Sequence, residues 1–133
     1  MKAYTDIEQS KKLAEILPLE SADMIYIWHA TSDNPAFRFD GDMPPMVLKD
    51  VPIKDITTNT LPCWSLVALL DVLPKGVKSP FGEINPFVGQ VGIKDYRCVY
   101  LDGDWDSNIQ TFANNPIDAC YEMIIKLKEQ ELL

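Results

Sequence analysis

A nearly uninterrupted apolar run, LVALLDVL at residues 66–73, constrains the fold of this chain more than any other feature. Ser65 before the run can cap a helix, and Pro74 after it stops one. A helix with Asp71 as its only polar residue has no side that suits water. The sequence therefore predicts a short central helix that other elements must cover.

Two further helices are predicted, one towards each end of the chain. The first begins at Thr5, where Thr5-Asp6-Ile7-Glu8 has the form of a capping box, and Pro18 ends it. The last begins after Asn115, a capping residue followed by a proline in the first turn. Its apolar residues recur at spacings of three and four, which indicates an amphipathic helix: Ile117, Cys120, Tyr121, Ile124 and Leu127.

Strands are predicted between these helices. Residues 24–28, MIYIW, are apolar on both sides and indicate a central or well-covered strand. Residues 90–93 and 96–101 follow a proline- and glycine-punctuated stretch, 76–89, which we expect to be a loop or an irregular hairpin. A turn at Asp102-Gly103 then leads into a return strand that ends at Phe112.

Residues 43–62 carry four prolines, Pro44, Pro45, Pro52 and Pro62. Prolines at this density exclude a long helix and confine any strand to the edge of a sheet. We expect an extended connection, and its 44–60 portion is one candidate partner surface because long loops are often functional.

The order of these elements predicts an α+β fold. We expect an antiparallel sheet with about three helices, N-terminal, central and C-terminal, packed on one face. A chain of 133 residues is long enough for one respectable core, so residues 1–133 are expected to form a single globular domain.

Composition excludes several classes of function. The net charge of −8 disfavours direct binding to nucleic acid or to anionic membranes, both of which need basic residues. No run of about 18 apolar residues and no signal peptide is visible, so we expect a cytoplasmic protein. Three cysteines, an odd number without short spacing, suit neither a disulfide framework nor a zinc site. No phosphate-binding loop or other cofactor motif occurs, so no cofactor is expected.

Three sets of residues are candidates for chemistry. Cys63 precedes a helix start and could be a nucleophile with His29, the sole histidine, as base, although packing is the favoured interpretation. The predicted acidic turn holds three possible calcium ligands, Asp102, Asp104 and Asp106. It lacks the glycine and glutamate of an EF-hand, which leaves at most a weak surface site. A platform for a small ligand could be built from three aromatic residues, Trp28, Tyr100 and Trp105.

Three segments resemble a group of small proteins from intestinal bacteria and their prophages or mobile elements. The shared motifs are E-Q-S-K-K-L, P-C-W-S-L-x-A-L-L-x-x-L-P and N-P-x-D-A, found here from residue 8, from residue 62 and from residue 115. The resemblance covers a little over a third of the chain and carries no activity. It implies that Ser65 and Pro116 are cap and first-turn residues, and it favours an accessory protein of a mobile element.

The leading hypothesis is therefore a non-enzymatic accessory or protein-interaction protein. Its partner would be a protein, with a second copy of the chain as one option, bound through the 44–60 connection and the sheet edge or hairpin near residues 102–106. A small-ligand binding module and a cysteine-dependent enzyme using Cys63 are the alternatives.

Overall fold

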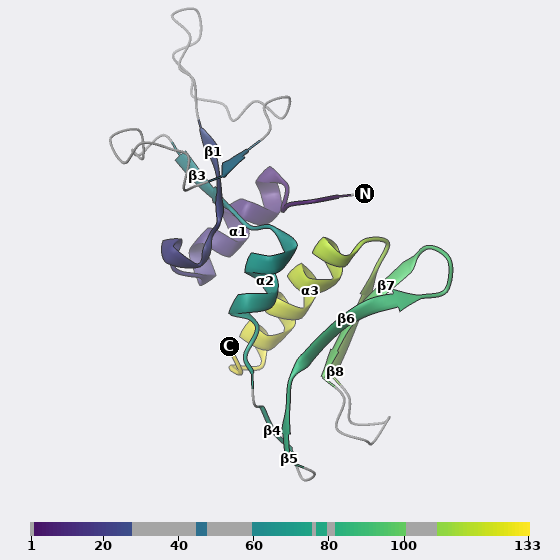
Figure 1. Ribbon diagram of the computed structural model, residues 1–133. Coiled ribbons are helices and arrows are strands. Elements are labelled where there is room, and N and C mark those ends of the chain that lie inside the picture. Colours follow the sequence, from purple (N-terminus) through teal and green to yellow (C-terminus); the bar gives the residue numbers. More distant parts are fainter. Residues whose placement is uncertain (1, 28–44, 48–59, 76, 80–81, 101–108) are drawn as a thin grey trace, which may run out of the picture. The chain divides into compact units, whose positions relative to one another are not determined.

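The computed structural model describes residues 2–27, 45–47, 60–75, 77–79, 82–100 and 109–133 (Figure 1). Contacts divide the chain into two compact units, Tyr4–Ala68 and Met1–Ala3 with Leu69–Leu133. The described elements are, in order, α1 (Ile7–Ile16), a short 3-10 helix η1 (Leu19–Ser21), β1 (Met24–Ile27), β2 (Met46–Val47), β3 (Thr60–Cys63), α2 (Leu66–Val72), β4 (Val77–Ser79), β5 (Gly82–Ile84), β6 (Pro86–Val91), β7 (Asp95–Tyr100), β8 (Ile109–Ala113) and α3 (Pro116–Glu129).

The unit Tyr4–Ala68 contains a three-stranded antiparallel sheet in the order β2-β1-β3, with α1 packed against β3. The apolar strand β1 is central, as predicted. Pro62 lies in β3, opposite Ile25, and Pro45 directly precedes β2. Both proline-bearing segments are thus at sheet edges, where a missing N–H costs no ladder hydrogen bond.

The start of α1 differs by one residue from the prediction. The N-cap is Asp6, whose Oδ1 accepts the Gln9 N–H at 2.8 Å, while the Asp6 N–H donates to Gln9 Oε1 at 3.1 Å. The predicted box of Thr5 and Glu8 was therefore wrong. Thr5 is instead fully buried, and its N–H donates to the Trp64 carbonyl at 3.0 Å. Burial of its hydroxyl makes Thr5 unavailable as a cap, and the next residue takes that role.

The second unit contains a three-stranded antiparallel sheet in the order β6-β7-β8, covered on one face by α3 (Figure 1). The apolar stripe of α3 is buried as predicted, through Ile117, Cys120, Met123, Ile124 and Leu127. The stretch 76–89, expected to be a loop or an irregular hairpin, holds the β4–β5 hairpin and the first four residues of β6. Pro86 fits there because it is the first residue of an edge strand.

The α+β prediction is confirmed, with helices packed against antiparallel sheet. The described strands form two three-stranded sheets and one hairpin rather than the one sheet expected. In the central helix α2, Ala68 and Leu69 are buried, whereas Val67 is 67% exposed. The predictions for Trp28, for most of the 44–60 connection and for the Asp102-Gly103 turn lie outside the described residues.

Candidate functional site

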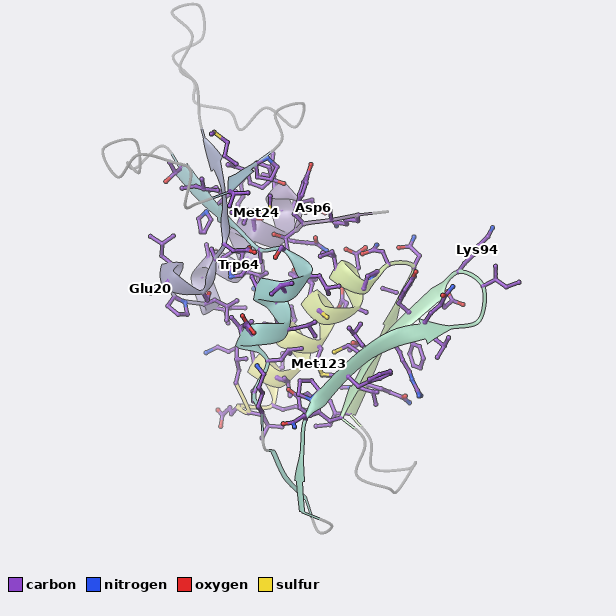
Figure 2. The ribbon with its side chains drawn as sticks, viewed as in Figure 1. Asp6, Glu20, Met24, Trp64, Lys94 and Met123 are labelled. Carbon is purple, nitrogen blue, oxygen red and sulfur yellow. The ribbon has the colours of Figure 1, made fainter. Side chains whose placement is uncertain are left out.

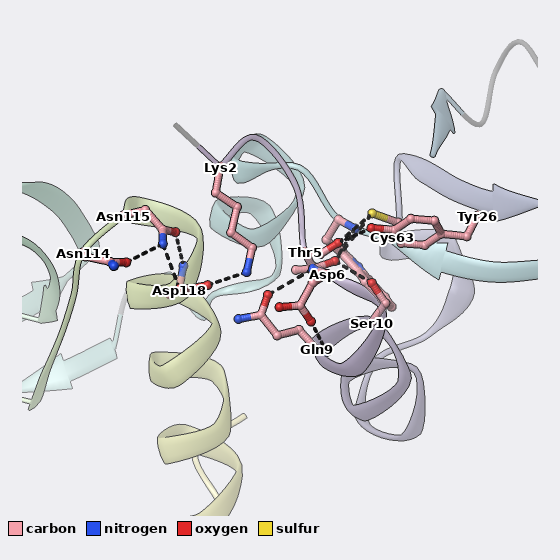
Figure 3. A network of polar contacts seen from close by, with 11 residues as sticks. Lys2, Thr5, Asp6, Gln9, Ser10, Tyr26, Cys63, Asn114, Asn115 and Asp118 are labelled. Carbon is pink, nitrogen blue, oxygen red and sulfur yellow. Dashed lines mark hydrogen bonds and ion pairs between the residues drawn. The ribbon is translucent and has the colours of Figure 1, made fainter. Parts of the chain in front are cut away.

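Cys63 ends β3 inside a buried polar cluster centred on Thr5 (Figure 3). The Thr5 Oγ1 atom lies 2.8 Å from Ser10 Oγ and 3.6 Å from Cys63 Sγ, and it accepts the Trp64 N–H at 3.2 Å. The Tyr26 hydroxyl donates to the Thr5 carbonyl at 2.8 Å. We call Thr5, Ser10, Tyr26 and Cys63 the Thr5 cluster.

The Thr5 cluster is poorly suited to nucleophilic chemistry. Burial raises the pKa of the Cys63 thiol, and the opposing effect of hydrogen bonds from Thr5, Ser10 and Tyr26 is smaller. The pKa of Tyr26 is also raised, first by burial and then by the proximity of Cys63. A neutral thiol is a weak nucleophile. These contacts favour packing over catalysis, and His29, the expected base, lies outside the described residues.

Ser65 has the structural role that the sequence suggests. Its Oγ accepts the Ala68 N–H at 3.3 Å, which caps the first turn of α2. The Asp23 carboxylate in turn accepts the Ser65 N–H at 2.9 Å and the Ser65 hydroxyl. The side chain at the start of α2 is thus held by a carboxylate from the residue preceding β1.

The other two cysteines lie in the second unit, Cys98 on β7 and Cys120 on α3. Both are fully buried and neither forms a disulfide, as expected for core thiols. Tyr100, two residues beyond Cys98, is also buried, and its hydroxyl donates to the Pro74 carbonyl at 2.7 Å.

The predicted ligand platform of Trp28, Tyr100 and Trp105 stays a prediction. Of these three residues only Tyr100 lies in the described part of the chain. The acidic residues 102, 104 and 106 fall outside it as well. Within the described ranges, no group of three or more His, Cys, Asp or Glu side chains could hold a metal ion.

The face of the β6-β7-β8 sheet away from α3 carries two exposed phenylalanines. Strand register places Arg97 directly opposite Gly89 on one side and Phe112 on the other, so these three residues share a face. Phe87 is two residues before Gly89 and therefore points the same way. Phe87 is 55% exposed and Phe112 is 57% exposed.

Gly89 lets the ring of Phe87 lie over the strand. A Cβ atom at position 89 would sit 2.7 Å from Phe87 Cε1 and 2.8 Å from Cζ, so the ring of Phe87 would have to move. The ring of Phe87 thus occupies the space beside Arg97, and Phe112 flanks Arg97 on β8. We call Phe87, Gly89, Arg97 and Phe112 the aromatic face.

Sequence reasoning missed the aromatic face because residues 76–89 were expected to be irregular. One signal was available in β8, IQTFA. Its alternation puts Ile109, Thr111 and Ala113 on one side and leaves Phe112 on the opposite side, beside polar Gln110. Lys94 marks the far end of this sheet, at the tip of the β6–β7 turn (Figure 2).

Searches among known proteins returned no match to a family model, to a curated protein or to a solved structure. The resemblance to small proteins of intestinal bacteria and mobile elements therefore stays a prediction. In the described part of the chain, no helix is both long enough and apolar enough to span a membrane.

Proposed function

We propose that this chain is a non-enzymatic protein-interaction protein, an accessory to a prophage or mobile element, that binds a protein partner through the aromatic face. The observation that carries the proposal is the pair of phenylalanines, each more than half exposed, on one face of one sheet. The resemblance of three sequence motifs to proteins of mobile elements supports the accessory role.

The composition of the aromatic face suits a protein interface. Aromatic residues and arginine are enriched in the buried centres of protein interfaces, whereas lysine and glutamate are depleted there. The Nε atom of Arg97 is already buried before any partner binds. Phenylalanine side chains have few rotatable bonds, so they lose little side-chain entropy on association.

Burial of the two rings would supply much of the binding energy. Full burial of one phenylalanine side chain is worth about 1.5–3 kcal/mol. Aromatic anchors of this kind commonly dominate the energetics of an interface. Removal of both rings should therefore weaken the binding of a partner by a large factor while leaving the core of the sheet intact.

The cysteine-dependent enzyme is less well supported. Its candidate nucleophile, Cys63, is buried, and its thiol pKa is raised. The binding surfaces expected at 44–60 and 102–106 stay predictions beside the aromatic face.

The proposal is tested by capture with matched variants. Tagged wild-type chain, the double variant Phe87→Ser/Phe112→Ser and the control Ile93→Ser are incubated with nuclease-treated host lysate, with and without prophage induction. Ile93 is 90% exposed in the β6–β7 turn, so its variant removes an exposed apolar side chain outside the aromatic face.

We expect one stoichiometric protein to be retained by the wild type and by Ile93→Ser and to be lost with the double variant. Purified partner should show a Kd at least tenfold weaker for the double variant by calorimetry. A partner that binds the double variant as tightly as the wild type, or the lack of any partner in both lysates, would refute the proposal.

A further inference from the structure

Cys98 on β7 and Cys120 on α3 are both fully buried where this helix packs on this strand. Cys98 is directly opposite Thr111 of β8, so the two side chains share the face of the sheet that α3 covers. The Thr111 hydroxyl donates to the Ala119 carbonyl of α3 at 2.7 Å. The strand neighbour of Cys98 therefore touches the helix backbone one residue before Cys120.

That contact also shows that helix and sheet approach closely at this level. A threonine side chain is short, and its hydroxyl reaches the main chain of α3 directly. Disulfides need Cα atoms within about 7 Å, a separation that long side chains between a helix and a sheet would prevent. Here the neighbouring residues, Thr111 and Ala119, are small enough to permit it.

The two thiols influence each other's ionisation. The neighbouring Cys120 thiol lowers the pKa of Cys98, and Cys98 together with burial raises the pKa of Cys120. A thiolate is the form of cysteine that reacts with oxidants, so this difference favours Cys98 as the attacking sulfur. Cys120 is then the resolving thiol.

We propose that Cys98 and Cys120 form an oxidisable dithiol that a hydroperoxide converts into an intrachain disulfide joining β7 to α3. The proposal does not rest on the proposed protein partner.

In the first step the Cys98 thiolate attacks hydrogen peroxide, an S–O bond forms, the O–O bond breaks and hydroxide leaves. Cys98 is then a sulfenic acid. In the second step the Cys120 sulfur attacks Cys98, the S–O bond breaks and the oxygen leaves as water with the thiol proton. The hydroxide of the first step takes up the proton lost by Cys98, so two thiols are oxidised, one peroxide is reduced and two waters form.

Burial determines which oxidant can act. Both cysteines are fully buried, so a small hydroperoxide that enters during local opening is favoured over a bulky disulfide such as oxidised glutathione. Cys63 offers a control within the chain. It is buried to the same extent, but its sulfur contacts the hydroxyl and carbonyl oxygens of Thr5 rather than a second thiol.

The experiment treats the reduced full-length chain with increasing hydrogen peroxide under native conditions. The protein is then quenched with catalase, denatured and alkylated, and its mass and peptide map are measured. We expect loss of two hydrogens, alkylation of Cys63 alone, and a cross-linked peptide pair that contains Cys98 and Cys120. Reduction should restore three alkylated thiols. The oxidised form should melt roughly 5–15 °C higher because the loop between the cysteines is closed.

Variants identify the pair, and circular dichroism checks that each variant is folded. Cys63→Ser should still form the disulfide, whereas Cys98→Ala and Cys120→Ala should stop at mono-oxidised or unmodified protein and show no rise in melting temperature. Three alkylated thiols after treatment that oxidises a free cysteine peptide would overturn the proposal. So would a disulfide that includes Cys63, one that links two chains, or one that forms only in denaturant. The wild-type peptide map decides the question even where a core variant fails to fold.

Discussion

At the scale of single residues, the Thr5 side chain is the centre of a buried set of polar contacts. Its hydroxyl contacts Ser10 and Cys63 and accepts the Trp64 N–H, all in buried surroundings. Removal of one buried hydrogen-bonding group leaves its partners buried without a hydrogen bond. The desolvation penalty of those partners is larger than the net contribution of the bond to stability.

Thr5→Val should therefore lower the free energy of unfolding by about 2–3 kcal/mol, since the variant keeps the shape but loses the hydroxyl. Thr5→Ser keeps the hydroxyl and loses one methyl group, so it should cost about 1 kcal/mol. Urea unfolding monitored by tryptophan fluorescence measures both. Equal losses for the two variants would show that the hydroxyl contacts contribute nothing.

Stability at alkaline pH should depend on Tyr26. Burial raises the pKa of Tyr26 above its ordinary value of 10.0, so the unfolded chain releases this proton first. The stabilising contribution is full below pH 10 and is lost as pH rises through the unfolded and then the folded pKa. Cys63 acts in the same direction from its ordinary value of 9.0.

We expect the free energy of unfolding to fall from pH 9 upwards, and to fall less steeply above pH 10 in Tyr26→Phe. That variant should also lose about 1 kcal/mol at pH 7, because the bond from the hydroxyl to the Thr5 carbonyl is removed. Urea unfolding in reducing buffer at pH 7, 9, 10 and 11 measures the slopes. Equal pH slopes of the unfolding free energy above pH 10 in Tyr26→Phe and wild type would contradict the assignment of this pH dependence to Tyr26.

At the scale of elements, the N-terminal capping of α1 in the structure differs from the capping that the sequence pattern predicts. Asp6 and Gln9 form the capping box, whereas Glu8 is exposed and forms an ion pair with Lys11 at 3.7 Å. An N-cap substitution to alanine costs about 1 kcal/mol, and an exposed ion pair of this length contributes little.

Asp6→Ala should therefore lower the free energy of unfolding by about 1 kcal/mol, and Glu8→Ala by less than about 0.5 kcal/mol. Thermal and urea unfolding of the two variants provide the comparison. A larger loss in Glu8→Ala than in Asp6→Ala would restore the Thr5–Glu8 box that the sequence suggests.

At the scale of the whole molecule, net charge limits what the aromatic face can bind. Exposed aromatics on a sheet can also stack against the bases of single-stranded nucleic acid. Such binding depends on neutralising phosphates, and this chain carries a net charge of −8. The charge thus favours a protein partner over a nucleic acid.

Fluorescence anisotropy with labelled single-stranded DNA and RNA should show no saturable binding below about 100 μM protein at 0.15 M salt. The Phe87→Ser/Phe112→Ser variant should behave identically. Binding in the micromolar range that the double variant loses would reassign the aromatic face to nucleic-acid recognition.

The sequence by itself determined the elements that depend on a few neighbouring residues. Asn115 and Pro116 begin α3, Ser65 caps α2, and the apolar stripe of α3 is buried. Proline at position 62 confined any strand there to the edge of a sheet, because a residue without an N–H cannot serve in the middle of a sheet. Each of these rules depends on residues within one or two helical turns of one another, or on a single missing backbone N–H donor. They can therefore be applied without knowing the fold.

Only the tertiary structure decided the contacts between distant segments. It divided the described strands among two three-stranded sheets and a hairpin, buried the Thr5 hydroxyl beside Cys63, placed Cys98 on the sheet face that α3 covers, and aligned Phe87 with Arg97 and Phe112. Each of these depends on strand register or on helix–sheet packing. A shift of one residue in register would turn every side chain of a strand to the opposite face, and the choice of pairing partner depends on residues outside the strand itself.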